Sequence, residues 1–328
     1  MKNDLNGRTA VLLINLGTPE KPEEKEVREY LKEFLSDKDV IRLPRLIWLP
    51  ILYSFILPFR SKKSAELYKQ VWTERGSPLL FNTCDQSKSL QKRMEENNPN
   101  KYHIEVAMRY GVPSIDSAIK KLKNNGFKKI IYIPLFPQYS TTTTLSIHKK
   151  INKFKQVFPK NKFLSNFHTH NLYIEAISNK IKKFQEDNGS PDKLLFSYHG
   201  IPKSYIGPDE PYEEQCYKTS ELIAAKLKLQ KKSYEVVFQS RLGTSEWLKP
   251  YLSERLKELP DEGIKNIQIF CPGFVSDCLE TLEEVGEEAK DIFLDANGKK
   301  YNFINCLNDD SSFIDLLEDI VLTKEQEF

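Results

Sequence analysis

The sequence predicts an α/β protein built from two similar Rossmann-like halves, each a four-stranded parallel sheet flanked by helices. The expected strands are continuous apolar and β-branched runs, which is typical of parallel strands that are covered on both faces. Helical patterns alternate with these strands, as in βαβ units. The residues at the strand ends also recur in the same order in the two halves, which indicates an internal repeat.

Eight strands are expected, four in each half. Those of the first half are Thr9–Leu16, Tyr102–Met108, Lys129–Leu135 and Lys162–Asn166, and those of the second are Lys193–Tyr198, Tyr234–Gln239, Asn266–Cys271 and Lys300–Asn305. We expect residues 1–168 to form the N-terminal half and residues 169–328 the C-terminal half. A last helix at about 309–322 is a candidate to pack back on the N-terminal half.

Three pairs of strand exits carry the repeat. "LLINLGTP" at Leu12–Pro19 matches "LLFSYHGIP" at Leu194–Pro202, "EVAMRYG" matches "EVVFQSRLG", and "IPLFPQYS" matches "FCPGFVSD". Ligands of open parallel sheets bind outside the carboxyl ends of the strands. We therefore expect an active-site cleft between the two halves.

Composition excludes several classes of protein. The chain has 49 Lys and Arg against 46 Asp and Glu, a net charge of +3 that is far from the basic excess of a nucleic-acid-binding protein. The turn after the first strand holds only Gly17 where a dinucleotide fingerprint needs three glycines, and no P-loop motif occurs. We expect neither nucleic acid nor a nucleotide as the main ligand.

The cysteines and the first residues of the chain indicate the cellular compartment of the protein. Five cysteines are present, without a C-x-x-C pair, which argues against a disulfide framework and against a structural zinc site. The polar start, MKNDLNGR, predicts neither a signal peptide nor a transit peptide. These features predict a protein of the reducing cytoplasm.

The segment Leu43–Phe59, here called the lip, is almost entirely apolar. It is too short to span a bilayer and contains three prolines and Arg45. A buried core helix is one interpretation. The prolines and the basic flank Arg60–Lys63 favour the other, an exposed lip that dips into lipid headgroups, and we expect Trp48, Leu52 and Phe55 to make this contact.

His199 ends a buried strand just before Gly200, at the edge where chemistry is expected. Glu280, Glu284 and Glu288 are spaced four apart on a following helix that begins at the same edge. A solvated acidic face is the plain interpretation of such a row, but its place beside a histidine favours function. An imidazole facing a carboxylate can accept protons or hold a divalent metal transiently. The other four histidines are expected at the surface or in the core.

With these stretches, the chain resembles the ferrochelatase family, whose members insert ferrous iron into protoporphyrin IX in the last step of haem synthesis. The resemblance covers almost the whole chain, and its most specific stretches are "SYHGIP" and "SDCLETLEE". It implies that His199 and Glu280 are catalytic and contact the metal, that His199 removes pyrrole protons or ligates iron, and that Glu284 and Glu288 conduct metal or protons. It also implies a π-helical form for this acidic segment.

The resemblance further assigns the porphyrin-binding residues. Arg60, Tyr68 and Ser77 correspond to propionate contacts, Arg109 and Tyr139 to pocket residues on the opposite face of the macrocycle, and Trp247 and Phe274 to the wall of the pocket. The lip corresponds to the surface through which porphyrin enters from the membrane. Some members have a histidine where Cys278 stands, so contact of Cys278 with metal is left open.

The expected cofactors and partners follow from the same resemblance. Animal members hold an iron–sulfur cluster with a cysteine near the position of Thr141 and a cysteine-bearing C-terminal extension; this chain ends at Phe328. We expect no cluster and no tightly bound cofactor, with Fe²⁺ and protoporphyrin IX as substrates. We expect a cytoplasmic monomer or homodimer, peripherally associated with the inner membrane.

Two alternatives stay open. One is a membrane-docking tetrapyrrole carrier, which would need the aromatic pocket but not the acidic row. The other is a chelatase for cobalt or for coproporphyrin, whose more soluble substrate would not need the lip.

Overall fold

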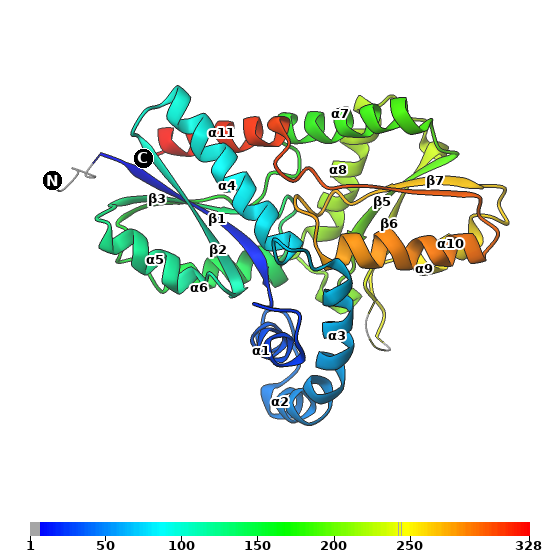
Figure 1. The fold of residues 1–328 in the computed structure, drawn as a ribbon, viewed down its shortest axis with the longest axis horizontal. Helices are drawn as coiled ribbons and strands as arrows, with labels where there is room; N and C mark the ends of the chain where they lie inside the picture. Colours follow the sequence, from blue (N-terminus) through cyan, green and yellow to red (C-terminus); the bar gives the residue numbers. More distant parts are fainter. Residues whose placement is uncertain (1–6, 242, 244) are drawn as a thin grey trace. The chain divides into compact units, whose positions relative to one another are not determined.

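The computed structural model describes residues 7–241, 243 and 245–328, which fall into two compact units (Figure 1). Unit 1 consists of the chain up to Phe136 together with Ser140–Asn166 and Asp309–Phe328, and unit 2 of Pro137–Tyr139 and Phe167–Asn308. The first six residues of the polar N-terminal segment, and Leu242 and Thr244 of the "FQSRLGTSEWLKP" stretch, lie outside the described residues.

Unit 1 is built on a parallel sheet of strand order β2-β1-β3-β4. The strands are β1 (Thr9–Thr18), β2 (Tyr102–Gly111), β3 (Lys129–Pro134) and β4 (Lys160–Phe163). The helices are α1 (Glu24–Leu35), α2 (Arg45–Ile51), α3 (Leu57–Val71), α4 (Pro78–Asn97), α5 (Ile115–Asn124), α6 (Ser146–Asn152) and α11 (Ser311–Gln326). Figure 1 shows α4 and α11 on one face of the sheet and α5 and α6 on the other.

Unit 2 repeats this topology with the strand order β6-β5-β7-β8, again all parallel. The strands are β5 (Lys193–His199), β6 (Tyr234–Gln239), β7 (Asn266–Phe270) and β8 (Lys300–Ile304). The helices are α7 (Asn171–Asn188), α8 (Tyr212–Lys226), α9 (Leu252–Glu258) and α10 (Ala289–Asp295). The predicted pair of four-stranded parallel sheets is therefore confirmed. The two sheets also share their strand order, since in each unit the first strand lies between the second and third.

Apolar strands explain this architecture. Residues of β1 from Ala10 to Ile14 are fully buried, as are Leu195 and Phe196 of β5, so helices must cover both faces of each sheet. One core cluster joins β1, β2 and β3 to α5 and α6, and another joins β5, β6 and β7 to α9 and α10. Strand β4 begins two residues before its predicted start; it is a half-exposed edge strand, whose ends hydrophobicity does not fix.

Two segments each belong to a unit whose other residues lie elsewhere in the sequence. Helix α11 packs on α4 of unit 1, where Arg93 forms an ion pair with Asp315 and Lys129 of β3 pairs with Glu325 at 3.2 Å. The segment Pro137–Tyr139 belongs to unit 2 because Gln138 Nε2 donates to Thr219 Oγ1 at 3.0 Å and to Pro272 O at 3.3 Å.

The lip forms α2, a π-helical turn at Leu52–Ile56 and the start of α3. Most of the exposed large hydrophobic residues of the described chain lie in it, including Leu46 at 92%, Phe55 at 62% and Phe59 at 75% exposure. Two of the three residues expected to contact lipid are nevertheless buried. Trp48 is 9% exposed and donates its indole Nε1–H to Leu35 O at 2.7 Å, and Leu52 is fully buried.

The expectation was therefore wrong for Trp48 and Leu52, and the exposed face of the lip is made by their neighbours. An amphipathic helical segment must use some of its apolar residues to attach itself to the body of the protein. Composition alone does not reveal which residues these are. Among the described residues, no helix is long and apolar enough to cross a bilayer.

Candidate active site

His199 is the last residue of β5. Its Nδ1 lies 2.7 Å from the carbonyl oxygen of Gly200. Because a carbonyl oxygen can only accept a hydrogen bond, Nδ1 is the donor in this contact, which leaves Nε2 as the ring nitrogen that can accept a proton. The Tyr212 hydroxyl donates to the main-chain carbonyl of His199 at 3.0 Å and fixes the strand end. His199 therefore presents a basic nitrogen at the carboxyl edge of the sheet.

Gly200 allows the chain to pass closely beside Trp247. Its backbone N–H donates to Gln239 O at 2.8 Å. A Cβ at this position would lie 2.9 Å from that oxygen and 3.3 Å from Cε3 of Trp247, so a larger residue would force the strand end apart. Trp247, expected as a wall residue, thus packs directly against the residue that follows His199.

The acidic segment Glu280–Glu288 is a π-helix, as the family resemblance implied. It begins shortly after β7 and continues into α10. Glu280 and Glu284 are partly covered, whereas Glu288 is exposed. The row thus extends from the interior of unit 2 to its surface.

The carboxylate of Glu284 is held by the residues at the end of β6. Ser240 donates its backbone N–H to Oε1 at 2.6 Å and its hydroxyl to Oε2. Gln239 Nε2 donates to Oε2 at 3.3 Å and to the Glu280 carbonyl at 2.9 Å, while its own Oε1 accepts from Ser197 at 2.8 Å. Ser240 has a φ of 65°, a left-handed conformation that is unfavourable for a serine. This backbone strain is tolerated where both donors of Ser240 reach Glu284.

Burial raises the pKa of Glu284, although the hydrogen bond from Ser240 and the nearby His199 oppose this effect. The negative charge of Glu280 raises the pKa further. A carboxyl group of raised pKa next to a basic imidazole nitrogen is suited to exchange protons. His199, Glu280 and Glu284 are thus electrostatically linked in one site, while Glu288 lies at the exposed end of its helix.

Asp277 anchors the start of this acidic segment. Its buried carboxylate accepts from Asn308 Nδ2 at 2.8 Å, Asn305 Nδ2 at 3.0 Å, the backbone N–H of Cys306 at 3.1 Å and Thr281 Oγ1 at 3.2 Å. Burial raises the pKa of the neighbouring Cys278 thiol, and the charge of Glu280 adds to the effect. Cys278 is thus a protonated thiol in the fold as it stands. No group of three or more potential metal ligands occurs within the described ranges.

Two further expected porphyrin contacts lie in unit 2. Tyr139 is half-buried and donates its backbone N–H to Gln215 Oε1 of α8 at 2.7 Å. Phe274 is half-buried after β7 and packs against the core cluster of α9 and α10. Tyr139 follows β3 and Phe274 follows β7, each in the loop after the carboxyl end of the strand.

The other expected contacts lie in unit 1. Arg60 is half-buried on α3, whereas Tyr68 and Ser77 are largely buried. Tyr68 packs edge-on against Tyr30, with ring centroids 6.4 Å apart. Arg109 lies at the end of β2, where it forms an ion pair with Asp37 and donates from Nε to Ser146 Oγ at 2.8 Å.

Comparisons with known proteins decide the family. The ferrochelatase family model matches residues 8–325. The chain belongs to the ferrochelatase family. The ferrochelatase of Idiomarina loihiensis is 45% identical over 317 residues, covering 96% of this chain and 87% of the relative. The ferrochelatase of Aliivibrio fischeri is 45% identical over 322 residues, covering 97% of this chain and 98% of the relative.

Solved structures support the ferrochelatase fold. SirB from Bacillus subtilis with Fe³⁺ has a TM-score of 0.56 at 11% identity, covering 97% of this chain and 95% of its own. CbiX, the terminal enzyme of siroheme biosynthesis in denitrifying bacteria, has a TM-score of 0.52 at 10% identity, covering 96% and 98%. At these identities the likeness concerns the fold alone.

Ser240 and Gln239, which hold Glu284, and Asp37, which pairs with Arg109, are not among the residues predicted from the sequence. A signal existed for the first two residues, because Gln239 ends β6 and Ser240 follows it, at the sheet edge where His199 ends β5, and His199 pairs with Gln239 in the register. No local pattern links Asp37 to Arg109, because the two residues are far apart in the chain.

Proposed function

We propose that this chain inserts Fe²⁺ into protoporphyrin IX to give protoheme with release of two protons, in the last step of haem biosynthesis. It is thus a metal chelatase of the lyase class. The observation that carries this proposal is that His199, which ends β5, lies close enough to the buried carboxylate of Glu284 for its charge to lower the pKa of that group. A tetrapyrrole carrier would gain nothing from this pair or from the acidic row.

Metal insertion requires two pyrrole N–H protons to leave as a dication arrives. We assign Nε2 of His199 as the acceptor of the first pyrrole proton, because Nδ1 already donates to the carbonyl oxygen of Gly200. Glu284, whose pKa burial raises, takes protons onward, and the exposed Glu288 exchanges them or incoming metal with solvent. Glu280 contributes negative charge that compensates the arriving iron.

The porphyrin itself would be held by the residues that the family resemblance assigns. Arg60, Tyr68 and Ser77 are proposed for the propionates, and the remaining contacts are Arg109, Tyr139, Trp247 and Phe274. A flat macrocycle shields its nitrogens, so an enzyme that binds a bent macrocycle more tightly than a flat one lowers the barrier. The close packing of Trp247 on Gly200 supports a rigid wall.

We propose that the exposed part of the lip contacts the inner membrane from the cytoplasm and collects the apolar substrate there. The exposed Leu46, Phe55 and Phe59 support this proposal. We also propose that the protein works without an iron–sulfur cluster, as a monomer or homodimer. Thr141 stands near the position where a cluster ligand would be needed, and its hydroxyl accepts a hydrogen bond from Arg42.

Anaerobic incubation tests the function directly. Purified protein is mixed with Fe²⁺ and either protoporphyrin IX or coproporphyrin, and loss of porphyrin fluorescence is followed. We expect faster loss with protoporphyrin. No loss with any porphyrin, with Fe²⁺, Zn²⁺ or Co²⁺, would refute the chelatase proposal, and a clear preference for coproporphyrin would refute the assigned substrate.

A further inference from the structure

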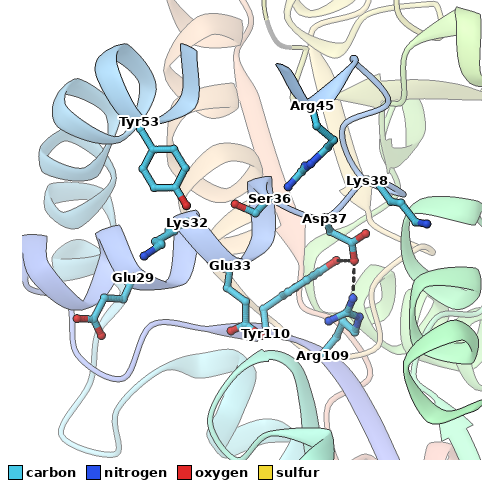
Figure 2. A pocket seen from close by; sticks show the side chains of 10 residues that line it. All are labelled: Glu29, Lys32, Glu33, Ser36, Asp37, Lys38, Arg45, Tyr53, Arg109 and Tyr110. Carbon is cyan, nitrogen blue, oxygen red and sulfur yellow. Dashed lines mark hydrogen bonds and ion pairs between the residues drawn. The ribbon is translucent and has the colours of Figure 1, made fainter. Parts of the chain in front are cut away.

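A pocket of about 740 Å³, lined mostly by charged residues, lies in unit 1 beside the lip. It is lined by residues of α1, the loop after α1, the lip and the end of β2: Glu29, Lys32, Glu33, Ser36, Asp37, Lys38, Arg45, Tyr53, Arg109 and Tyr110 (Figure 2). All ten belong to unit 1, so the pocket can be described within a single compact unit.

Two of the acidic residues in the lining are already engaged. Asp37 pairs with Arg109 and accepts from the Tyr110 hydroxyl at 2.9 Å, as the dashed lines in Figure 2 show. Glu33 accepts the backbone N–H of Gly111 at 2.9 Å. With Glu29, the lining holds three acidic side chains against four basic ones, and within the described residues no ion pair engages Lys32, Lys38 or Arg45. The small excess of positive charge favours an anionic ligand.

Two donors in the lining lack an acceptor. Nη1 of Arg45 and Oγ of Ser36 are both buried, and neither has a hydrogen-bond partner among residues 7–241, 243 and 245–328. In Figure 2 the Arg45 side chain points toward Ser36. Buried donors without a partner are rare in folded proteins because each has given up its bonds to water. An acceptor from outside the chain would satisfy both.

We propose that Ser36 and Arg45 bind the phosphate of an anionic phospholipid headgroup, with Lys32 adding positive charge. A guanidinium and a hydroxyl are common donors to phosphate oxygens. The lipid source is favoured over free phosphate because Arg45 is followed directly by Leu46 and Ile47, which are 92% and 57% exposed. The pocket thus adjoins apolar side chains that could contact acyl chains while the headgroup enters. This inference depends on the proposed membrane association for the source of the phosphate.

The test compares Arg45→Gln and Ser36→Ala with Lys120→Gln, which removes an exposed charge of α5 outside both the pocket and the lip. Binding is measured to vesicles of phosphatidylcholine alone and of phosphatidylcholine mixed with phosphatidylglycerol. We expect Arg45→Gln to weaken binding to the mixed vesicles about tenfold and Ser36→Ala to weaken it in the same direction, while Lys120→Gln changes it less than about twofold. Equal losses in Arg45→Gln and Lys120→Gln, with none in Ser36→Ala, would show long-range charge attraction and overturn the site.

Soluble probes separate the possible sources of phosphate. Glycerol 3-phosphate and inorganic phosphate are titrated into the wild type and Arg45→Gln by calorimetry. Weak binding of glycerol 3-phosphate that Arg45→Gln abolishes supports the site. Phosphate binding without any preference for phosphatidylglycerol vesicles overturns the lipid source. Because Arg109, a proposed porphyrin contact, also lines the pocket, displacement of glycerol 3-phosphate by protoporphyrin would show that porphyrin occupies it and would overturn the lipid proposal. Iron insertion into a porphyrin in solution is measured in parallel, so that failure of the chelatase proposal is recognised independently.

Discussion

Ser240 donates both its backbone N–H and its hydroxyl to the carboxylate of Glu284, from a left-handed backbone conformation at the end of β6. The same carboxylate accepts a hydrogen bond from Gln239 Nε2, which also donates to the carbonyl oxygen of Glu280. The orientation of the acidic row is thus set by a neighbouring strand and not by its own helix.

Replacing Ser240 tests this arrangement. Ser240→Ala keeps the backbone N–H but removes the hydroxyl donor, so the pKa of Glu284 should rise further and the acidic limb of the pH–rate profile should move to higher pH. We expect kcat to fall about tenfold. Ser240→Gly also lacks the hydroxyl but accepts the positive φ, and it should be more stable than Ser240→Ala by about 1 kcal/mol. An unchanged pH profile in both variants would remove Ser240 from the site.

Glu284→Gln should stabilise the fold at neutral pH while reducing activity. Burial raises the pKa of Glu284 above its ordinary 4.5, so its ionisation costs folding free energy. This cost is absent below pH 4.5, grows as the pH rises through the raised folded-state pKa, and is complete above it. The melting temperature of Glu284→Gln should therefore exceed that of the wild type by a few degrees at pH 8 and match it at pH 4. Glu288→Gln, which removes an exposed carboxylate of the same helix, serves as the control.

His199→Ala should abolish iron insertion while porphyrin binding stays within about tenfold, because the imidazole acts at the centre of the macrocycle. Porphyrin binding is measured by fluorescence titration and insertion by loss of fluorescence with Fe²⁺. His103→Ala, which removes a half-buried ring stacked on Phe127, should keep normal turnover. Normal turnover in His199→Ala would contradict the assignment of the proton acceptor.

The two ends of the acidic row should behave differently. Glu280→Gln removes a partly covered charge next to Glu284 and should lose most activity at any iron concentration. Glu288 is exposed, so Glu288→Gln should mainly raise the iron concentration needed for half-maximal rate. Steady-state kinetics with varied Fe²⁺ distinguishes the two, and the opposite ranking would reverse the proposed direction of the row.

The lip divides into attachment and contact residues, which separate substitutions can distinguish. Replacing the exposed Leu46, Phe55 and Phe59 by serine should leave the melting temperature nearly unchanged but weaken liposome binding and raise the KM for protoporphyrin. Leu52→Ser creates a buried defect and should cost about 2–5 kcal/mol in the free energy of unfolding. Early melting of the first variant would show that those side chains support the fold.

The class of fold and the identity of the main chemical groups follow from the sequence alone. Continuous apolar runs indicated parallel strands, since only strands covered on both faces need such runs, and the repeated exits indicated two equivalent sheets. His199 could be placed at a sheet edge because the strand before it and the glycine after it are local signals. These features depend on neighbours in the chain, so one-dimensional patterns contain them.

Features that depend on contacts between distant residues become visible only in the packed fold. The strained Ser240 reaches Glu284, Asp37 pairs with Arg109, and Trp48 turns inward to bond Leu35, although no local pattern distinguishes Trp48 from exposed neighbours such as Leu46. The raised pKa of Glu284 arises because segments that are distant in the sequence pack around its carboxylate. The buried donors of Ser36 and Arg45, which lack a hydrogen-bond partner, arise from such packing as well. Apolar composition shows how much surface a segment must bury, but only the packed fold shows which of its side chains remain exposed.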